Sequence, residues 1–348
     1  MTQADHWTNA LGGNWSTAAN WNPGIPTATL NAEIDASGSY SVAITKSAIA
    51  FGLLLNDAQA TVTDNNGGSL TLAGSGGAAN PNGALTINAG TFVLNGGGLK
   101  AGTISIGSGS TFQIANGTYT NSNALSEMIT DNGSIIDKTT ATITGNISGS
   151  GTILAENNAH LTIAGSLTAF TGSFTIANKA VLEFGTADFG NVAFASGSSG
   201  TVKFDAPLTS PLTTLTGTIS GLTPKVSIDL ADLTYVAGKM KASYLAGVLT
   251  VTNGSQSVSL NISGNFTNAT WVLSQDSTGG TIVVDPPSNP SLPAPPSSSP
   301  GLDQVVALFN QSIAAGFSDQ HQHGVLNTNP LSQVVTNQEQ FLAQPHHG

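Results

Sequence analysis

The sequence contains no cysteine and no arginine, and it has few charged residues of either sign. The absence of cysteine excludes disulfides, thiolate metal ligands and cysteine nucleophiles. All eight basic residues are Lys. Nucleic-acid binding draws on clustered Lys and Arg, so this scarcity argues against nucleic acid or an anionic membrane as a partner. Charged residues make up 8% of the 348 positions, against about 25% in typical globular proteins, and the formal net charge is −11.

Long apolar runs are also missing. The longest, AIAFGLLL at 48–55, is far shorter than the ~20 residues that a membrane-spanning helix needs. The first ten residues, MTQADHWTNA, have neither the basic start nor the apolar stretch of a secretory signal, so we expect no signal peptide there.

The sequence is instead rich in glycine, with 41 residues, and contains a degenerate internal repeat of about 19–21 residues between positions 60 and 205. Segment 83–97 aligns with 102–117, and segment 151–165 aligns with 172–185 and then 191–205. Each copy consists of short runs in which apolar and polar residues alternate, separated by turns rich in Gly, Asn and Ser. Such alternation predicts strands with one buried and one solvated face.

One copy of this repeat cannot bury its own apolar face, but stacked copies can. The sequence therefore predicts an all-β fold, a right-handed parallel β-helix (β-solenoid) with one coil per repeat. An antiparallel sandwich is the alternative, because its turns would also recur every 8–12 residues. The expected organisation is an N-terminal cap with first coils (1–60), β-solenoid repeats (61–217), a terminal antiparallel β module (218–285), a Pro/Ser linker (286–301) and an amphipathic helical tail (302–348).

Three of the four tryptophans, Trp7, Trp15 and Trp21, precede the repeats. The open end of a β-solenoid exposes strand edges and apolar core, and large aromatic side chains suit a cap over it. An aromatic platform for stacking sugars is the alternative. Trp271 is expected to anchor the terminal module, in which Asn253-Gly254 predicts a hairpin.

Candidate catalytic residues are few. Lyases on β-helices commonly use an Arg base, which this chain lacks, and glycoside hydrolases need converging carboxylates. The candidate pairs are Asp57 with Asp64, and Asp229 with Asp232. Asp57 and Asp64 occupy expected turns, where Asp is favoured for local hydrogen bonds. Asp229 and Asp232 flank an expected bend, as solvated residues or as Ca²⁺ ligands. We assign no catalytic, cofactor-binding or metal-binding residue, and we expect no enzyme activity and no cofactor.

The histidines fall into two groups. His6 and His160 lie in the β region, and His160 is expected to point outward into solvent. The other four lie near the C-terminus, where HQH and HH would bind Zn²⁺ or Ni²⁺ only weakly. We interpret these four as part of a polar tail: His321, His323, His346 and His347.

Segment 12–27, GGNWSTAANWNPGIPT, resembles the G-x-W-x-x-x-x-N-W-x-x-G-x-x-P segment that opens repeat regions of bacterial autotransporter passengers. The segment LNISGNFTNATWVLSQDSTGGTIVVDPP resembles the terminal module of surface or secreted repeat proteins of soil and root-nodule bacteria. The resemblance implies a β-solenoid that is extracellular or on the cell surface. We expect no outer-membrane barrel in this chain, because the C-terminal region lacks alternating ten-residue strands.

Three functions remain open. The first is a non-enzymatic exported β-solenoid that acts as an adhesion or surface-interaction protein, with glycans or cell-surface proteins as partners. The second is a polysaccharide-active enzyme, a lyase or hydrolase, on the same scaffold. The third is a structural stalk that displays the tail, whose two amphipathic segments would dock on each other, on a partner or on an export machine.

If the tail is an uncleaved export signal, deleting residues 302–348 abolishes secretion while leaving the amount of protein made by the cell unchanged. The measurement is the fraction of the protein in the culture medium of the native host. Undiminished secretion of the shortened chain would contradict the idea.

Overall fold

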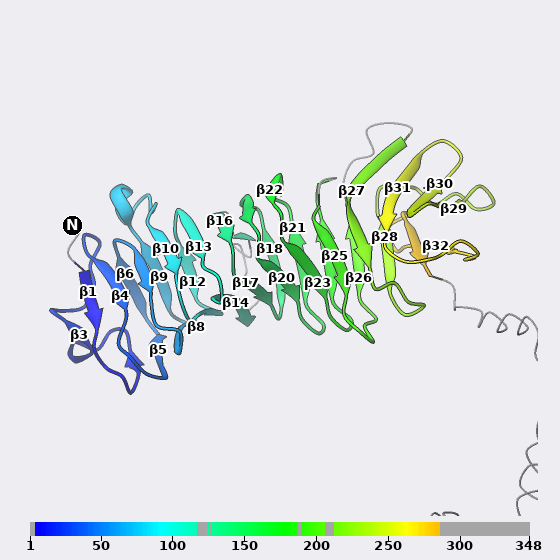
Figure 1. The fold of residues 1–348 in the computed structure, drawn as a ribbon. Coiled ribbons are helices and arrows are strands. Elements are labelled where there is room, and N and C mark those ends of the chain that lie inside the picture. The colour runs from blue at the N-terminus through cyan, green and yellow to red at the C-terminus, as the bar shows by residue number, and fades with distance from the viewer. Residues whose placement is uncertain (1–3, 117–123, 126, 187–188, 206–211, 286–348) are drawn as a thin grey trace, which may run out of the picture. The chain divides into compact units, whose positions relative to one another are not determined.

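The computed structural model describes residues 4–116, 124–125, 127–186, 189–205 and 212–285 (Figure 1). All of them belong to the first of two compact units, Met1–Asn289. The expected linker and helical tail lie outside the described residues. The described part is all-β, with 33 strands and two single-turn 3₁₀ helices, η1 (Ala18–Asn20) and η2 (Gly74–Gly76). No helix within it is both long and apolar enough to cross a membrane.

The strands form four sheets, and within each sheet every strand is hydrogen-bonded to the next one in the sheet order. A nine-stranded sheet has the order β22 (Ala169–Phe170), β19 (Ile147–Gly149), β16 (Met128–Asp131), β13 (Thr103–Ile106), β10 (Ala84–Ile87), β7 (Leu53–Leu55), β4 (Asn31–Ile34), β1 (Ala4–Trp7) and β3 (Trp21–Asn22). A three-stranded sheet has the order β12 (Gly98–Lys100), β9 (Ser69–Leu72) and β6 (Ser47–Ala50).

The other two sheets continue to the C-terminal side of the described chain. A 13-stranded sheet has the order β2 (Gly13–Asn14), β5 (Tyr40–Ile44), β8 (Ala60–Asn65), β11 (Thr91–Asn95), β14 (Thr111–Asn116), β17 (Ser134–Asp137), β20 (Thr152–Ala155), β23 (Ser173–Ile176), β25 (Asn191–Phe194), β27 (Leu212–Ser220), β31 (Ser257–Ile262), β30 (Val248–Thr252) and β29 (Lys241–Leu245). An eight-stranded sheet has the order β15 (Ala124–Leu125), β18 (Thr140–Ile143), β21 (His160–Ile163), β24 (Val181–Phe184), β26 (Thr201–Phe204), β28 (Ser227–Leu230), β33 (Thr281–Val284) and β32 (Val272–Gln275).

The chain visits these sheets in rotation. From β4 to β21 each strand pairs in parallel with the strand three places further along the chain, with one exception. The exception is β12, which does not pair with β15: β12 is the last strand of the three-stranded sheet, and β15 is the first strand of the eight-stranded sheet. Figure 1 shows the strands following one another in chain order along this unit. Parallel sheets visited in rotation are compatible with a β-solenoid and differ from the antiparallel sandwich that was its alternative.

The repeat alignment made from the sequence is confirmed residue by residue. Leu85 pairs with Ile104, and Phe92 pairs with Phe112. The second set also matches, because Ile153 pairs with Phe174 and Leu161 pairs with Leu182. The alternating pattern sets this register, since a shift by one residue would turn every apolar side chain to the solvent.

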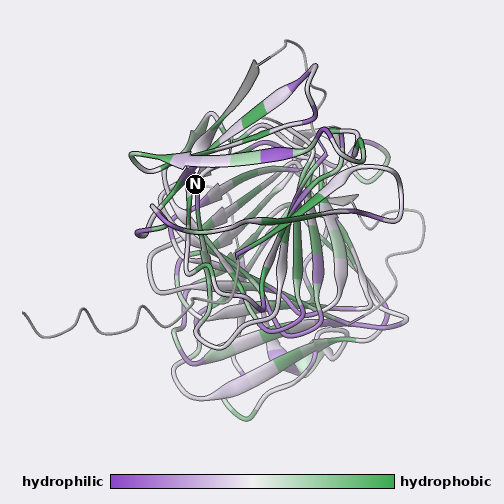
Figure 2. Cartoon of the chain, turned by 90° about the vertical axis from the view of Figure 1, so that its right-hand side faces the viewer, coloured by the Kyte–Doolittle hydropathy of each residue, from purple (hydrophilic) through white to green (hydrophobic). Residues whose placement is uncertain are grey.

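Inward-facing residues of successive strands form apolar columns in the interior. One column of the 13-stranded sheet is almost completely buried and contains Val42, Val62, Phe92, Phe112, Ile135, Ile153, Phe174 and Val192. Within it the rings of Phe92 and Phe112 stack with their centroids 5.8 Å apart. Hydrophobic residues recur along the strands throughout this unit (Figure 2).

The three N-terminal tryptophans are buried together. Trp7, Trp15 and Trp21 are 1–5% exposed, and Trp21 packs edge-on against the other two at centroid distances of 5.1 and 4.7 Å. Trp21 lies in β3, a two-residue strand that pairs antiparallel with β1 at the edge of the nine-stranded sheet. Pro23 follows directly, which fits an edge strand because proline has no N–H to donate. Their burial leaves no open aromatic platform for sugars.

The C-terminal region differs from the expected antiparallel module at 218–285. The hairpin at Asn253-Gly254 is confirmed, and β32 pairs antiparallel with β33. However, β31 pairs in parallel with β27, and β28 pairs in parallel with β26, so both large sheets run on into this region. The sequence did not show this because β27 and β31 are separated by a 36-residue excursion that carries the repeat far beyond its usual length. Trp271 is half-buried against Phe266, with ring centroids 5.4 Å apart.

Replacing Trp21 by alanine is expected to lower the free energy of unfolding by about 3–5 kcal/mol, because it leaves a cavity against Trp7 and Trp15. Urea unfolding followed by circular dichroism measures this. Leu11→Ala is the matched control in the same segment, since Leu11 is 95% exposed. Equal effects of the two substitutions would contradict the role given to the tryptophan cluster.

Candidate functional site

The outer face of the 13-stranded sheet carries a continuous column of short polar side chains. We call it the polar column: Ser41, Thr61, Thr91, Thr111, Ser134, Thr152, Ser173 and Asn191. Neighbouring members lie on adjacent strands, about 4.8 Å apart. All of them are partly or fully exposed, and the hydroxyl of Thr152 donates to that of Ser134 over 3.3 Å.

A second outward column runs beside the first, two residues further along each strand. This mixed column is partly exposed and more apolar: Ala43, Thr63, Val93, Gln113, Ile136, Leu154, Thr175 and Ala193. Neither column contains a charged residue. Together they form a surface of hydroxyl and amide groups next to small apolar groups, extending over eight strands.

The carboxylate pair suggested by Asp57 and Asp64 does not form. Asp57 lies at a turn as expected and accepts the backbone N–H of Gln59 over 2.8 Å. Asp64 was expected at a turn, but it lies near the end of β8 with its side chain fully buried. It occupies an inward position of the sheet, whereas Asp57 is partly exposed, so the two carboxylates do not converge on one substrate.

Asp229 and Asp232 are separated as well. Asp232 is exposed in a turn, whereas Asp229 lies within β28 and is half-buried, so its expected position at a solvated bend is wrong. Asp229 lies instead beside Asp276, and the two carboxyls can form a hydrogen bond only when one of them is protonated. Burial first, and then the charge of Asp276, raise the pKa of Asp229 to about 6. Burial alone would raise the pKa of Asp276, but hydrogen bonds from three residues together prevail and lower it: Thr278, Gly279 and Gly280.

A chain of charged side chains leads to Asp229 across the outer face of the eight-stranded sheet. Glu183 accepts from His160 and from Lys203, each over 2.9 Å, and Lys203 is the register partner of Asp229. Burial alone would raise the pKa of Glu183, but its hydrogen bonds from Lys203 and His160 prevail and lower it. His160 points outward as expected, but it is paired with a carboxylate rather than only solvated.

Three aspartates occupy inward positions that apolar residues fill in the neighbouring strands. Asp64 lies between Ile44 and Leu94. Asp137 lies between Ile114 and Ala155 in the same column. Burial raises the pKa of both carboxyls to about 7, and for Asp137 a hydrogen bond from the backbone N–H of Thr139 opposes this more weakly.

Asp131 is the third, at the end of β16 next to Ile106. Burial raises its pKa to about 6, which the backbone N–H of Gly133 offsets only in part. Glycine leaves room for this carboxyl, since a Cβ on Gly151 would lie 2.4 Å from its Cγ. The three buried aspartates face backbone and apolar neighbours, and such surroundings do not present a carboxylate to a substrate.

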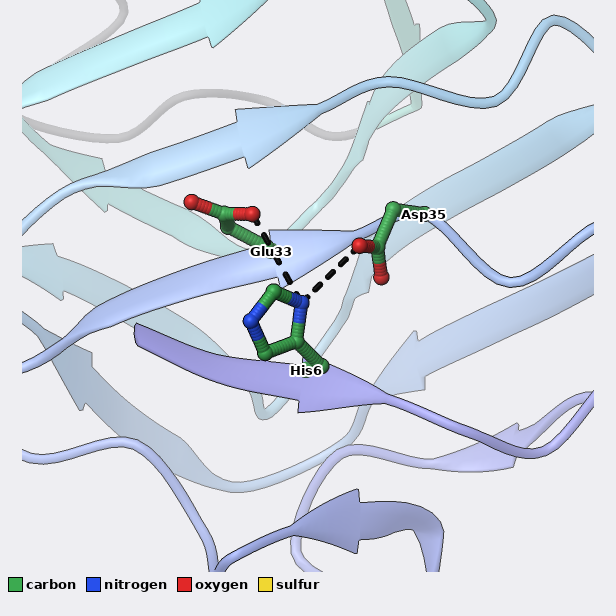
Figure 3. A group of neighbouring side chains, drawn as sticks. All are labelled: His6, Glu33 and Asp35. Carbon is green, nitrogen blue, oxygen red and sulfur yellow. Dashed lines mark hydrogen bonds and ion pairs between the residues drawn. The ribbon is translucent and has the colours of Figure 1, made fainter. Parts of the chain in front are cut away.

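A cluster of one histidine and two carboxylates lies at the N-terminal edge of the nine-stranded sheet (Figure 3). His6 on β1 is the register partner of Glu33 on β4, and Asp35 follows β4 directly. The Nδ1 atom of His6 lies 2.9 Å from Oδ2 of Asp35 and 3.6 Å from Oε2 of Glu33. The hydrogen bond to Asp35 is the main reason why the pKa of His6 is raised, against a smaller opposing effect of burial.

This cluster was not anticipated from the sequence, because neither His6 nor its partners fall within the clear repeats. A weak signal exists in the segments ADHW and NAEI, which share the same alternation of partly exposed and buried residues. His6 and Glu33 both occupy the third, outward-facing position of their segment. Recognising that these runs pair requires the parallel register, which a 27-residue separation hides. Within the described residues this is the group of His, Asp and Glu whose ligand atoms all lie within 4.8 Å of one another.

Compared with known proteins, the chain matches no family model, no curated protein and no solved structure. The resemblance to autotransporter passengers therefore stays a prediction.

The buried aspartates make stability depend on pH. Their pKa values are raised above the ordinary value of 3.8, so between about pH 4 and pH 7 the native state holds more protons than the unfolded state. Stability that is present below pH 4 is therefore lost as the pH rises through 6 to 7. We expect a higher urea midpoint at pH 5 than at pH 8.

Asp137→Asn is expected to flatten this dependence, removing a cost on the order of 4 kcal/mol that the ionised carboxylate imposes at pH 8. The control is Asp57→Asn, which changes a partly exposed turn residue whose cap an asparagine can also supply. An unaltered pH profile for Asp137→Asn would contradict the assignment.

Proposed function

We propose that this protein is a non-enzymatic surface-interaction protein that binds an extended neutral polysaccharide along the outer face of its 13-stranded sheet. The observation that carries the proposal is the polar column, with the mixed column beside it. Hydroxyl and amide groups repeated on successive strands match the repeated hydroxyl groups of a linear glycan. The apolar members of the mixed column suit the C–H faces of sugar rings.

The charge of this surface selects the class of glycan. The two columns carry no charged residue, and the chain as a whole has no arginine and a net charge of −11. An acidic polysaccharide would find no cationic partner in these two columns and would be repelled by the protein as a whole. A neutral chain loses nothing by desolvating such a surface, provided that its hydroxyls find partners there.

The architecture and location form part of the same proposal. The parallel sheets are taken to wind as a right-handed β-helix whose N-terminal end is capped by the three tryptophans. Burial of Trp7, Trp15 and Trp21 supports the cap. Export to the bacterial cell surface, with the tail at 302–348 as the segment that engages the export machinery, is supported only by the sequence resemblance.

A polysaccharide-active enzyme is the second candidate, and the carboxyl pair of Asp229 and Asp276 favours it. Their pKa values are displaced in opposite directions, as in an acid and base pair. The two groups are, however, close enough to share a proton. Retaining glycosidases hold their carboxyl groups about 5 Å apart, and inverting ones hold them further apart. A pair in direct contact leaves no room for a glycosidic bond, so we prefer the binding function.

The full chain is expected to bind neutral polysaccharides in a glycan array and to release no product from them. Thr111→Glu combined with Ser173→Glu places two charges on the polar column without making them neighbours. This variant should lose at least about tenfold in affinity, because each carboxylate is desolvated by the bound sugar.

The matched control combines Thr103→Glu with Thr130→Glu on the outer face of the nine-stranded sheet. Equal losses in both variants would move the binding surface elsewhere. Product release abolished by Asp229→Asn would favour the enzyme, and the absence of any glycan binding would favour a structural stalk.

A further inference from the structure

We propose that His6, Glu33 and Asp35 form a binding site for a divalent transition-metal ion such as Zn²⁺. The site is independent of the proposed glycan surface, because it lies on a different sheet. It combines one imidazole nitrogen with two carboxylate oxygens, a donor set that suits zinc and its neighbours in the first transition row.

The two distances from the His6 nitrogen to the carboxylate oxygens fit one shared ion, and the three ligand atoms all lie within 4.8 Å of one another. Two ligands bound at about 2.1 Å to the same metal lie about 3.0 Å apart in octahedral geometry and about 3.4 Å apart in tetrahedral geometry. The Nδ1 atom of His6 lies 2.9 Å from the Asp35 oxygen and 3.6 Å from the Glu33 oxygen. Figure 3 shows both carboxylates directed toward the same ring nitrogen of His6. All three groups are partly exposed, so an ion and its remaining water ligands can reach them.

A simple ion pair accounts for only part of this arrangement. One Nδ1–H group can be donated well to a single oxygen, and Asp35 lies at hydrogen-bonding distance whereas Glu33, at 3.6 Å, does not. Asp5, the preceding residue of β1, points to the buried side of the sheet and is not a ligand, but its charge adds weakly to those of Asp35 and Glu33. Two carboxylates thus face one histidine nitrogen, and a divalent cation would balance their charge.

A second histidine pair in the same chain shows the contrast. His160 lies 2.9 Å from Glu183, the same distance as between His6 and Asp35. At that pair the other carboxylate oxygen is occupied by the ammonium group of Lys203, also at 2.9 Å. The described ion pairs of His6 involve two carboxylates and no lysine. The fold therefore offers one histidine–carboxylate pair that is already neutralised and one that is open to a cation.

Binding would join the terminal strand β1 to β4 through side chains as well as backbone. The metal would thus hold the edge of the nine-stranded sheet next to Trp7, and its binding should raise the melting temperature of the protein.

The test uses the full chain with the four tail histidines replaced by glutamine (His321, His323, His346 and His347), because they would otherwise bind zinc themselves. Titration with ZnCl₂ in a calorimeter is expected to show one equivalent bound and a higher melting temperature. CaCl₂ at the same concentration should not displace the zinc, since Ca²⁺ prefers six to eight oxygen ligands.

His6→Ala and Glu33→Gln, made in this background, are each expected to weaken zinc binding by at least about tenfold. Glu33→Gln is the sharper test, because it keeps the hydrogen bond between His6 and Asp35 and with it the local fold. His160→Ala is the matched control and should leave zinc binding unchanged. The proposal is overturned if zinc fails to bind, or if it binds equally well to the His6→Ala and Glu33→Gln variants.

Discussion

Parallel pairing of each strand with the corresponding strand of the next repeat is the constraint on which the rest of this structure depends. It places a residue directly above its counterpart, so every position in the repeat becomes a column. Inward columns are mostly apolar because they exclude water, and Val62, Phe92 and Phe112 illustrate how completely they are buried; the three buried aspartates are the exceptions. Outward columns are free to vary, and in this chain they are uniformly short and polar along one line of the 13-stranded sheet. The same pairing leaves an unpaired edge at each end, which explains the need for the tryptophan cluster.

The sequence was sufficient to predict the parts of the fold that repeat. Alternating apolar residues identified the strands, and the alignment of Leu161 with Leu182 predicted their register. The sequence was insufficient where the local residues suggest a different structure from the one formed, or where the pairing strand lies far away in the chain. Asp64 sits in DNNGG, which favours a turn locally, yet the strand continues through it and carries its carboxylate inward. The parallel partner of β27 is β31, which the chain reaches only after an excursion, and no periodicity reveals such a pair.

The chemistry of the candidate sites was harder to predict than the fold, for a related reason. A repeat indicates which residues share a column only if both strands belong to recognisable copies. His6 and Glu33 lie in the degenerate first coils, and the carboxyl pair of Asp229 and Asp276 joins a strand to a distant turn. In both cases the partners are set by long-range register. By contrast, the absence of arginine and the scarcity of charge were plain in the composition, and they restrict the kinds of ligand that any surface of this chain can hold.

The buried aspartates also bear on how the molecule would come apart. If the repeats stack as in the proposed solenoid, each contacts only its neighbours. Stability is then close to a sum of local contributions, and a weak interface between two repeats is not compensated by distant ones. Asp131 and Asp137 belong to the same coil, near the middle of the described chain, and both become costly once they ionise. A pulling force or a rise in pH would therefore first unfold the repeat that contains Asp131 and Asp137. The repeats on either side would stay folded, each with its own intact columns, and would be joined by one locally unfolded segment.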